Sequence, residues 1–365
     1  MSVAHMIEEW RSRVESTELG TIGVEEEYLL VSPEDHAPVS AAEELRRRAE
    51  GDERLRLELP PCQLEMATEP RRSVEDVHRE LTAARRSVAE WSDGVARPLS
   101  AAVHPLLVGF EGPACTPRAQ QLVARYGPAA RRQLVGALQV HVALGDCDRL
   151  LAVHDALRTY LPHLAALAAS APFAGGEDQA LASVRPLVAA WLPRHGTPPI
   201  LGSWDNLEAQ ICWGASSGVL GDHTQWWWDL RPSPAHGTLE IRVPDAQPTV
   251  EDAMGVVELV VAVVRWLADR HDAGDLPEPV PTWRIDENRW SAFAFGIDGR
   301  FVDPEERGGS AWTRDAVEAL VTEVRPSAER ELSHTTALLD DPAYRRLRRV
   351  GLDESIDWLA GQFLA

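Results

Sequence analysis

Positive charge is scarce in this 365-residue chain, which has 36 Lys and Arg against 57 Asp and Glu. The formal net charge of −21 repels the phosphates of nucleic acids and the headgroups of anionic lipids, so neither is expected as a partner. Cysteine is also rare. None of the four cysteines forms a CxxC pair, and a chain of this length needs no disulfide staples.

Long apolar segments are missing as well. The longest apolar run, residues 256–264, is interrupted by Glu258 and is far shorter than a membrane span. The first 15 residues are charged and amphipathic and lack the apolar core of a secretory signal. We therefore expect a cytoplasmic protein with no membrane partner. Its hydrophobic fraction of 44% and charged fraction of 25% are ordinary for a folded domain.

Two kinds of periodicity divide the rest of the chain. A helical period is clearest over residues 74–95, 118–135, 149–169, 178–190 and 249–272. Ser73 and Thr249, each followed closely by acidic residues, are typical of helix N-caps. Strand-like alternation covers residues 21–31, 54–59, 63–68, 103–109, 138–144, 226–230 and 238–243.

This order predicts an α+β fold, with a mainly antiparallel sheet covered by helices on one face. Residues 272–281, rich in proline and acidic residues, are expected to form a surface connection, and further helices follow residue 311. No repeat and no boundary is visible, so we expect a single domain over residues 1–365, with a core at about 20–270 and a mostly helical C-terminal extension at 271–365.

The first expected strand carries acidic residues where a half-buried strand should be apolar. Alternation places Glu25 and Glu27 on one face and Val24, Glu26 and Tyr28 on the other. Two carboxylates about 7 Å apart on one sheet face repel each other unless a cation lies between them. A solvated edge strand is the alternative explanation of this segment alone.

A second pair of acids, Glu58 and Glu65, lies on either side of Pro60-Pro61. Each is flanked by apolar residues, so both are expected to project away from a buried side, and the prolines break any regular ladder between them. Taken alone, the segment could equally be a surface loop with incidental acids.

Two later strands add further polar faces. Gln139 and His141 share one face of residues 138–144, while Thr238, Glu240 and Arg242 share one face of residues 238–243. A satisfied histidine and a cross-strand salt bridge by Arg242 are the plain alternatives.

Together these strands supply five carboxylates and one imidazole, an oxygen-rich set that suits Mg²⁺ or Mn²⁺ better than a cysteine-bound zinc. Such ions on a sheet face suit phosphoryl chemistry, because metals neutralise phosphate oxygens. The sequence has neither a GxxxxGK[ST] loop nor a GxGxxG loop, so a nucleotide would be held by metals, arginines and the sheet.

Several motifs resemble one known family. They are TIGVEEEYLLV (21–31), LEMAT (64–68), HP (104–105), QVHV (139–142), ASVR (182–185), WDLRPSP (228–234) and GTLEIRVPD (237–245). In this order and spacing they are similar to the carboxylate–amine ligases of the glutamate–cysteine ligase type 2 family. The resemblance covers about residues 20–270. It implies a glutamine-synthetase-like domain, with a curved six-stranded sheet, helices on its convex face and an open concave active site.

The resemblance also implies roles for individual residues. One metal ion would be held by Glu27, Glu58 and Glu65, and a second by Glu25, His141 and Glu240, within a total of two or three Mg²⁺ or Mn²⁺ ions. Arg242 would neutralise the transferred phosphate, with Arg231 and Arg185 as candidates for the substrate carboxylate or the acyl-phosphate. Arg242, Arg231, Gln139 and Thr238 are the expected contacts to ATP, and Arg242, Arg231, Arg185 and Glu240 are the expected catalytic residues.

The implied activity joins a small-molecule carboxylate to an amine in an ATP-dependent reaction through an acyl-phosphate. Glutamate with cysteine is the first pair to consider, but the chain departs from the family pattern. Family members commonly read GxHVHVG where residues 137–143 are ALQVHVA, and Gly-Thr where residues 102–103 are Ala-Val. A guanidino-kinase-like phosphotransferase and an inactive ligand-binding member are the alternatives. A homodimer is plausible from the frequency of symmetric oligomers.

Overall fold

The computed structural model describes residues 2–218, 225–303 and 309–365. A seven-stranded antiparallel sheet runs through its centre in the order β2–β3–β1–β5–β9–β8, and β4 pairs with the far end of β1. The strands of this sheet are β1 (Ile22–Val31), β2 (Leu55–Leu57), β3 (Gln63–Ala67), β4 (Arg97–Leu99), β5 (Leu138–Ala143), β8 (Leu230–Ser233) and β9 (Thr238–Ile241). Two small ladders lie outside it, β6 (Phe173–Ala174) with β7 (Glu177–Asp178) and β10 (Arg300–Val302) with β11 (Ser310–Trp312).

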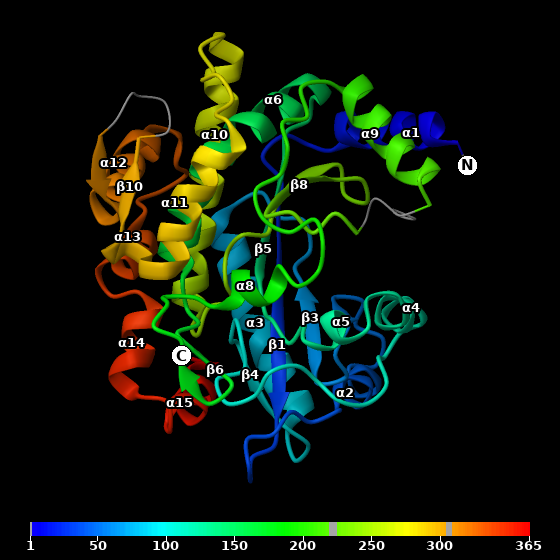
Figure 1. The fold of residues 1–365 in the computed structure, drawn as a ribbon, viewed down its shortest axis with the longest axis vertical. Helices are drawn as coiled ribbons and strands as arrows, with labels where there is room; N and C mark the ends of the chain where they lie inside the picture. Colours follow the sequence, from blue (N-terminus) through cyan, green and yellow to red (C-terminus); the bar gives the residue numbers. More distant parts are fainter. Residues whose placement is uncertain (1, 219–224, 304–308) are drawn as a thin grey trace.

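Helices surround the sheet (Figure 1). The first half of the chain contributes α1 (Val3–Ser16), α2 (Ala42–Arg48), α3 (Val74–Ser92), α4 (Pro117–Tyr126), α5 (Pro128–Arg131), α6 (Cys147–Leu157) and α7 (Leu161–Ala168). The second half contributes α8 (Arg185–Ala189), α9 (Trp204–Ser216), α10 (Val250–Ala273), α11 (Thr282–Phe295), α12 (Thr313–Val324), α13 (Ser333–Asp340), α14 (Ala343–Val350) and α15 (Ser355–Gln362). No helix within the described ranges is both long enough and apolar enough to cross a membrane.

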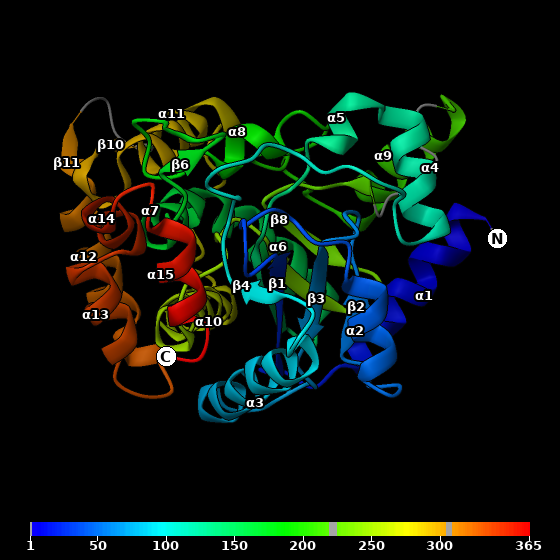
Figure 2. The same cartoon turned by 90° about the horizontal axis from the view of Figure 1, so that it is seen from below.

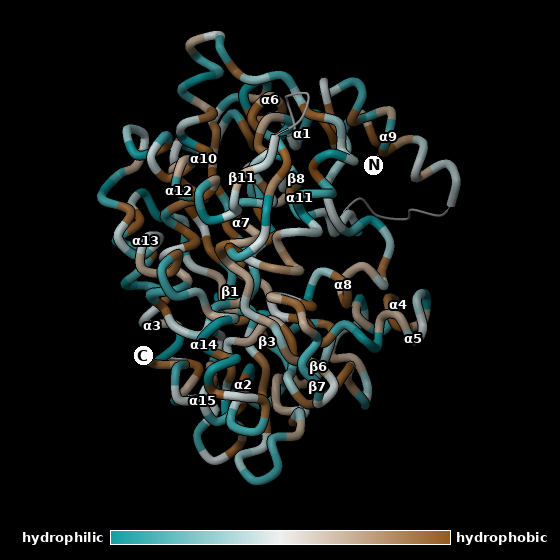
Figure 3. Tube along the Cα trace, turned by 60° about the vertical axis from the view of Figure 1, so that its left-hand side comes forward, coloured by the Kyte–Doolittle hydropathy of each residue, from teal (hydrophilic) through white to brown (hydrophobic). Residues whose placement is uncertain are grey.

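One face of the sheet forms the core. Apolar side chains of β1, β5 and β9 pack there against α3, α6 and α10; on the strands they are Ile22, Val24, Val140, Val142, Leu239 and Ile241. Fully burying such a side chain contributes about 1.5–3 kcal/mol. Figure 2 shows α3 below the sheet, with α4, α5 and α8 on the opposite side. In Figure 3 the hydrophobic segments run through the middle of the molecule.

The two expected helix caps are confirmed. The Ser73 hydroxyl accepts from the backbone N–H of Asp76 at 3.1 Å and begins α3, and the Thr249 hydroxyl accepts from that of Asp252 at 3.0 Å and begins α10. Each cap satisfies an N–H that the helix itself leaves unpaired. Helix α10 ends at Ala273 and is followed by Gly274, whose φ of 73° lies in the left-handed region that favours glycine.

Later helices pack on the same core as the sheet. Leu320 of α12 and Leu338 of α13 belong to the cluster that contains the β5 and α10 side chains. Helix α15 leads to Phe363, whose ring meets that of Tyr28 on β1 at 5.0 Å between centroids.

The α+β class with a mainly antiparallel sheet is confirmed, but three expected elements are wrong. Residues 103–109 form no strand, since Val103 makes a single bridge and Pro105 lacks the N–H that a ladder needs. The strand expected at 226–230 begins only at Leu230. The helix expected at 178–190 shrinks to α8, because Ala180 has a φ of 54° and Pro186 fits only a first helical turn.

The structure also divides an expected helix and adds a strand that was not predicted. The helix expected at 118–135 is broken at Gly127-Pro128 into α4 and α5 and ends at Arg131. Strand β4, which contains Pro98, was not predicted. It pairs with β1 at a point where β1 extends beyond β5.

Candidate active site

Strand β1 carries the acids from which the candidate site is built. Glu25 and Glu27 point to the face opposite the core, whereas Glu26 between them points toward α3 and accepts from Arg85 Nη2 at 2.6 Å. Arg85 is fully buried and also donates to the carbonyl of Gln247 at 2.9 Å. The predicted alternation is confirmed, and this buried ion pair fixes the face on which Glu25 and Glu27 stand.

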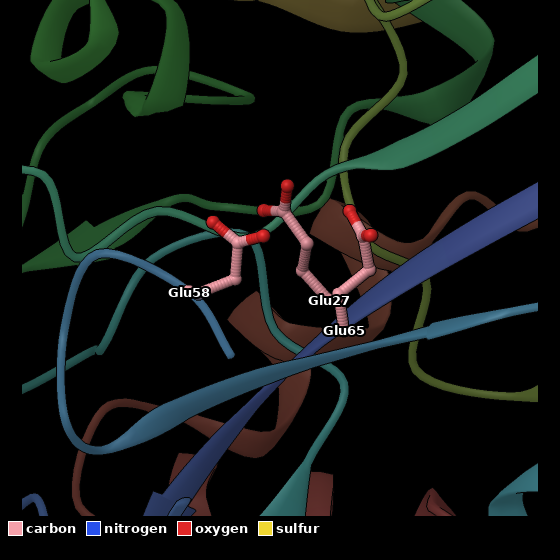
Figure 4. Close-up of side chains that lie close together, drawn as sticks. All are labelled: Glu27, Glu58 and Glu65. Atoms are coloured by element: carbon pink, nitrogen blue, oxygen red, sulfur yellow. The ribbon is translucent and has the colours of Figure 1, made fainter. Parts of the chain in front are cut away.

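Glu27, Glu58 and Glu65 form the acid cluster. One carboxylate oxygen of each lies within 4.8 Å of the other two. Glu27 and Glu65 are directly opposite in the β1–β3 register, and Glu58 stands in the connection between β2 and β3. Figure 4 shows the three side chains reaching into one space from these three segments. The set that the family resemblance implies for the first metal ion is therefore brought together.

The acid cluster is electrostatically crowded. Burial raises the pKa of Glu58 to about 8, and the neighbouring charges of Glu27 and Glu25 add to the effect. Burial, followed by the charges of Glu25 and Glu58, also raises the pKa of Glu65, and burial raises that of Glu27 despite Arg242. Three carboxylates in this arrangement fit a divalent cation, whose positive charge would offset their mutual repulsion.

Gln139 connects the acid cluster to an arginine. Its Nε2 donates to Glu27 Oε1 at 2.9 Å and to Glu65 Oε2 at 3.2 Å, while its Oε1 accepts from Arg242 Nη1. The backbone N–H of Ala137 donates to the second oxygen of Glu27 at 3.0 Å. Gln139 thus orients two carboxylates and Arg242 together, without carrying a charge of its own.

His141 lies beside the acid cluster on β5. Its Nδ1 is 2.9 Å from the Thr238 hydroxyl, and its Nε2 is 3.7 Å from Glu25 Oε2. That Nε2 is buried and has no hydrogen-bond partner among the described residues. A buried ring nitrogen that is held in place through its other nitrogen and aimed at a carboxylate fits a metal ligand. Although burial alone would raise it, the pKa of Glu25 falls to about 2 beside the imidazole and Arg56.

Glu240, the third ligand expected for the second metal ion beside Glu25 and His141, is placed differently. Glu240 is opposite His141 in the β5–β9 register, but both of its oxygens face arginines. Arg231 donates to them at 2.8 and 3.0 Å, and Arg242 pairs with one of them. Burial opposes ionisation, yet Arg231 and Arg242 hold the pKa of Glu240 well below its usual range. In this arrangement Glu240 anchors two guanidinium groups, and the second metal set remains a prediction.

Arg185 and Thr238 also occupy supporting positions. Arg185 Nε donates to Asp245 at 2.7 Å and is buried, and it is not among the described side chains that line the hollows over the acids. Thr238 touches His141, so in this structure it orients the imidazole. In this arrangement Arg185 holds Asp245 and does not face the acid cluster, and its expected catalytic role remains a prediction.

Three adjoining hollows cover this face of the sheet. The acid hollow, of about 300 Å³, lies between the acid cluster and α4 and is lined by Arg118, Arg231 and Arg242. The histidine hollow, of about 310 Å³, contains Thr68, His141 and Thr238. The arginine hollow, of about 550 Å³, contains Trp226, Arg231 and Glu240. Since single ligand sites occupy about 300–1,000 Å³, a nucleotide and two substrates would have to share all three.

Two residues of this site were missed by the sequence analysis. Arg56 of β2 donates to Glu25 at 2.6 Å and to Glu65 at 3.3 Å. His236, in the turn between β8 and β9, places its ring against that of His141, with 5.2 Å between centroids. Alternation from Glu58 would have put Arg56 on the same face, but its contact with Glu25, two strands away, has no local signal.

Comparison with known proteins identifies the same family that the sequence motifs resemble. The chain matches the family model described as glutamate–cysteine ligase family 2 over residues 21–351. A glutamate–cysteine ligase of Haloferax volcanii is 33% identical to it over 296 residues, covering 80% of this chain and 82% of that protein.

Two solved structures share the fold. A bifunctional glutathione synthetase from Pasteurella multocida superposes with a TM-score of 0.68 at 16% identity, over 99% of this chain and 54% of that one. This chain thus spans about half the length of that protein. A glutamate–cysteine ligase from Francisella tularensis, in complex with AMP, gives 0.66 at 12% identity, over 96% and 90%. The chain belongs to glutamate–cysteine ligase family 2, and it is an ATP-dependent carboxylate–amine ligase.

Proposed function

We propose that this enzyme activates a small amino-acid carboxylate with ATP and joins it to an amine, with glutamate and cysteine as the first pair to test. The observation that carries the proposal is the acid cluster, which lies next to Arg242 and Arg231 in the acid hollow, on the face of the sheet opposite the core. Glutamate and cysteine are chosen because the Haloferax volcanii relative is a glutamate–cysteine ligase.

Glu27, Glu58 and Glu65 would hold one divalent ion, Mg²⁺ or Mn²⁺, because all three are oxygen donors with raised pKa values and crowded negative charge. His141 Nε2 and Glu25 would contribute to a second position. Glu240 could join that position only if Arg231 or Arg242 moved away from it. When bound, such ions neutralise phosphate oxygens and orient the transferred group.

The arginines provide the remaining positive charge. Arg242 is tied to both Glu240 and Gln139, so its guanidinium is held over the acid cluster, where the transferred phosphate would lie. Arg231, which donates to the carbonyl of Trp226 at 2.9 Å, lies between the acid hollow and the arginine hollow. Charges fixed in advance stabilise a transition state without reorganisation.

The reaction would proceed in two steps. A carboxylate oxygen of the substrate attacks the γ-phosphorus of ATP, the bond to the bridging oxygen breaks, and ADP leaves with an acyl-phosphate formed. The amine nitrogen then attacks the acyl carbon, the carbon–oxygen bond to phosphate breaks, and the amine loses a proton as the amide forms. The residues of this chain bind and orient the reactants, and no covalent intermediate on the protein is required.

Two alternatives make different products. A phosphotransferase on the same fold would leave phosphate on a guanidino substrate, and a binding-only member would release none. The retained acids at positions 25, 27, 58, 65 and 240 favour catalysis over binding alone. Neither alternative has an observation of its own in its favour.

The test is release of phosphate from ATP and Mg²⁺ with a panel of amino acids and amines, singly and in pairs, with mass detection of the products. Ligation predicts phosphate release that requires a pair, with a product lighter than the two substrates together by one water. Phosphate retained on a single substrate would contradict ligation and establish the phosphotransferase.

We also propose that residues 1–365 act as one ligase unit. Leu320 and Leu338 of the C-terminal part pack into the same core as β5, which supports a single unit. A cytoplasmic location and a homodimer stay predictions, which fractionation and light scattering would test.

A further inference from the structure

Arg56 occupies the middle of the anionic face of the sheet. It lies opposite Glu65 in the β2–β3 register, and one nitrogen, Nη1, donates to Glu25 at 2.6 Å and to Glu65 at 3.3 Å. Its side chain lines the acid hollow, the histidine hollow and the arginine hollow. One guanidinium therefore contacts both expected metal positions, Glu65 at the first and Glu25 at the second.

Small residues open the path that this side chain takes. Glu25 lies on β1, two strands from Arg56, and its neighbour on the intervening β3 is Ala67. A methyl group there lets the long arginine side chain cross β3, whereas a larger side chain would stand between Arg56 and Glu25. Next to Glu25 on the same face, Gly23 has no side chain to occupy the space beside His141.

Arg56 is held less firmly than the other two arginines. Its side chain is 43% exposed, against 20% for Arg231 and 19% for Arg242, and among the described residues it has no partner on the scale of the two-point contact between Arg231 and Glu240. Partly exposed ion pairs contribute little net free energy, because water competes for both partners. Replacing Arg56 by another cation at these carboxylates therefore costs little free energy.

We propose that Arg56 is an exchangeable counterion, which pairs with Glu25 and Glu65 in the metal-free enzyme and turns to the phosphates of the nucleotide when divalent ions take those carboxylates. A guanidinium and a divalent ion compete for the same carboxylate oxygens. Once displaced, the planar guanidinium of Arg56 lies in a hollow that the ATP phosphates would enter. Its N–H groups can then donate to two phosphate oxygens at once. The inference rests on the proposed function, since it needs both the ions and ATP.

The test uses Arg56→Gln and Arg56→Lys, with Arg54→Gln as the matched control. Arg54 carries the same charge two residues earlier and also lines the histidine hollow, but its guanidinium is bound to Asp52 at 2.6 Å and to no residue of the acid cluster that the structure describes, so it is a control for the metal titration. Titration calorimetry with MgCl₂ or MnCl₂ alone measures metal affinity. A second titration with ATP at saturating Mg²⁺ measures nucleotide affinity.

Arg56→Gln is expected to bind the metal about fivefold or more tightly, because its internal competitor is gone, and to bind ATP about tenfold more weakly. Arg56→Lys keeps the charge but loses the fork, so both changes should be smaller and in the same direction. Arg54→Gln should bind the metal within about twofold of the wild type. A residue that merely supported the fold would weaken both affinities instead.

Each contrary result has a distinct meaning. Wild-type protein that binds neither ion would overturn the proposed function itself. Wild-type binding with unchanged or weaker metal affinity in Arg56→Gln would overturn only the inference about Arg56, as would equal tightening in Arg54→Gln. Tighter metal binding with unchanged ATP affinity would leave Arg56 a counterion and refute its turn toward the phosphates.

Discussion

Replacing Glu58 by glutamine should make the metal-free protein more stable and, at the same time, remove most of its stabilisation by Mg²⁺. The side chain keeps its shape but loses a carboxylate that burial and two neighbouring acids prevent from ionising freely. Without a metal ion, Glu58 is a cost of folding, whereas with one it is a ligand. No ordinary core or surface position behaves in both ways.

The size of the effect follows from the pKa of Glu58. That pKa rises from an ordinary 4.5 to about 8 in the folded protein, so the protonated form is favoured on folding. The stability from this group is fully present below about pH 4.5 and is lost as the pH rises toward 8. At pH 7 the loss amounts to about 3 kcal/mol. Coulomb repulsion gives a similar value, about 3 kcal/mol per ionised pair at an effective dielectric of about 20, for two charges at 4.8 Å, the upper limit of separation in the acid cluster.

The assay is urea unfolding of wild type and Glu58→Gln in chelator at pH 4.5 and pH 7, repeated at pH 7 with Mg²⁺. In chelator we expect equal stability at pH 4.5 and a gain of about 2–3 kcal/mol for the variant at pH 7. Mg²⁺ at about 100 times its Kd should add about 2.7 kcal/mol to the wild type and much less to the variant. A variant that is less stable in chelator, or equally stabilised by Mg²⁺, would refute the acid cluster as a metal site.

Three further outcomes are expected. Glu240→Gln should lower turnover by about 10² or more, because Arg231 and Arg242 lose the carboxylate that positions them; near-normal kcat in the phosphate-release assay would contradict this. Arg242→Lys should lower kcat by about tenfold or more, since a point charge cannot hold Glu240 and phosphate oxygens together; an unchanged kcat would argue against phosphate contact. Burial lowers the pKa of His163 to about 4, so folding favours the neutral imidazole. The free energy of unfolding therefore decreases as the pH falls below 6.5. At pH 5 this loss is about 2 kcal/mol relative to pH 7, and His163→Phe should lose correspondingly less, as measured by urea unfolding at the two pH values.

Local patterns determined much of the site. The face on which Glu25 and Glu27 lie follows from the two-residue period of a strand, and the structure puts Glu26 on Arg85 as that period requires. The caps at Ser73 and Thr249 depend on residues three positions away and were equally readable. The acid cluster was implied by the family resemblance, and the fold brings Glu58 of the β2–β3 connection and Glu65 of β3 beside Glu27 of β1.

Tertiary structure alone decided which partner each charged group has. Arg56 reaches Glu25 across 31 positions of sequence, and Arg185 pairs with Asp245 across 60, so neither pairing leaves a periodic trace. Glu240 was expected to bind a metal because of the family resemblance, whereas local sequence fixes only its strand face. Its partner Arg231 comes from the neighbouring strand and depends on the register of β8, while Arg242 lies two positions further along the chain. A strand sequence sets the side to which a residue points, whereas its counterion is set by the strands that the fold brings beside it.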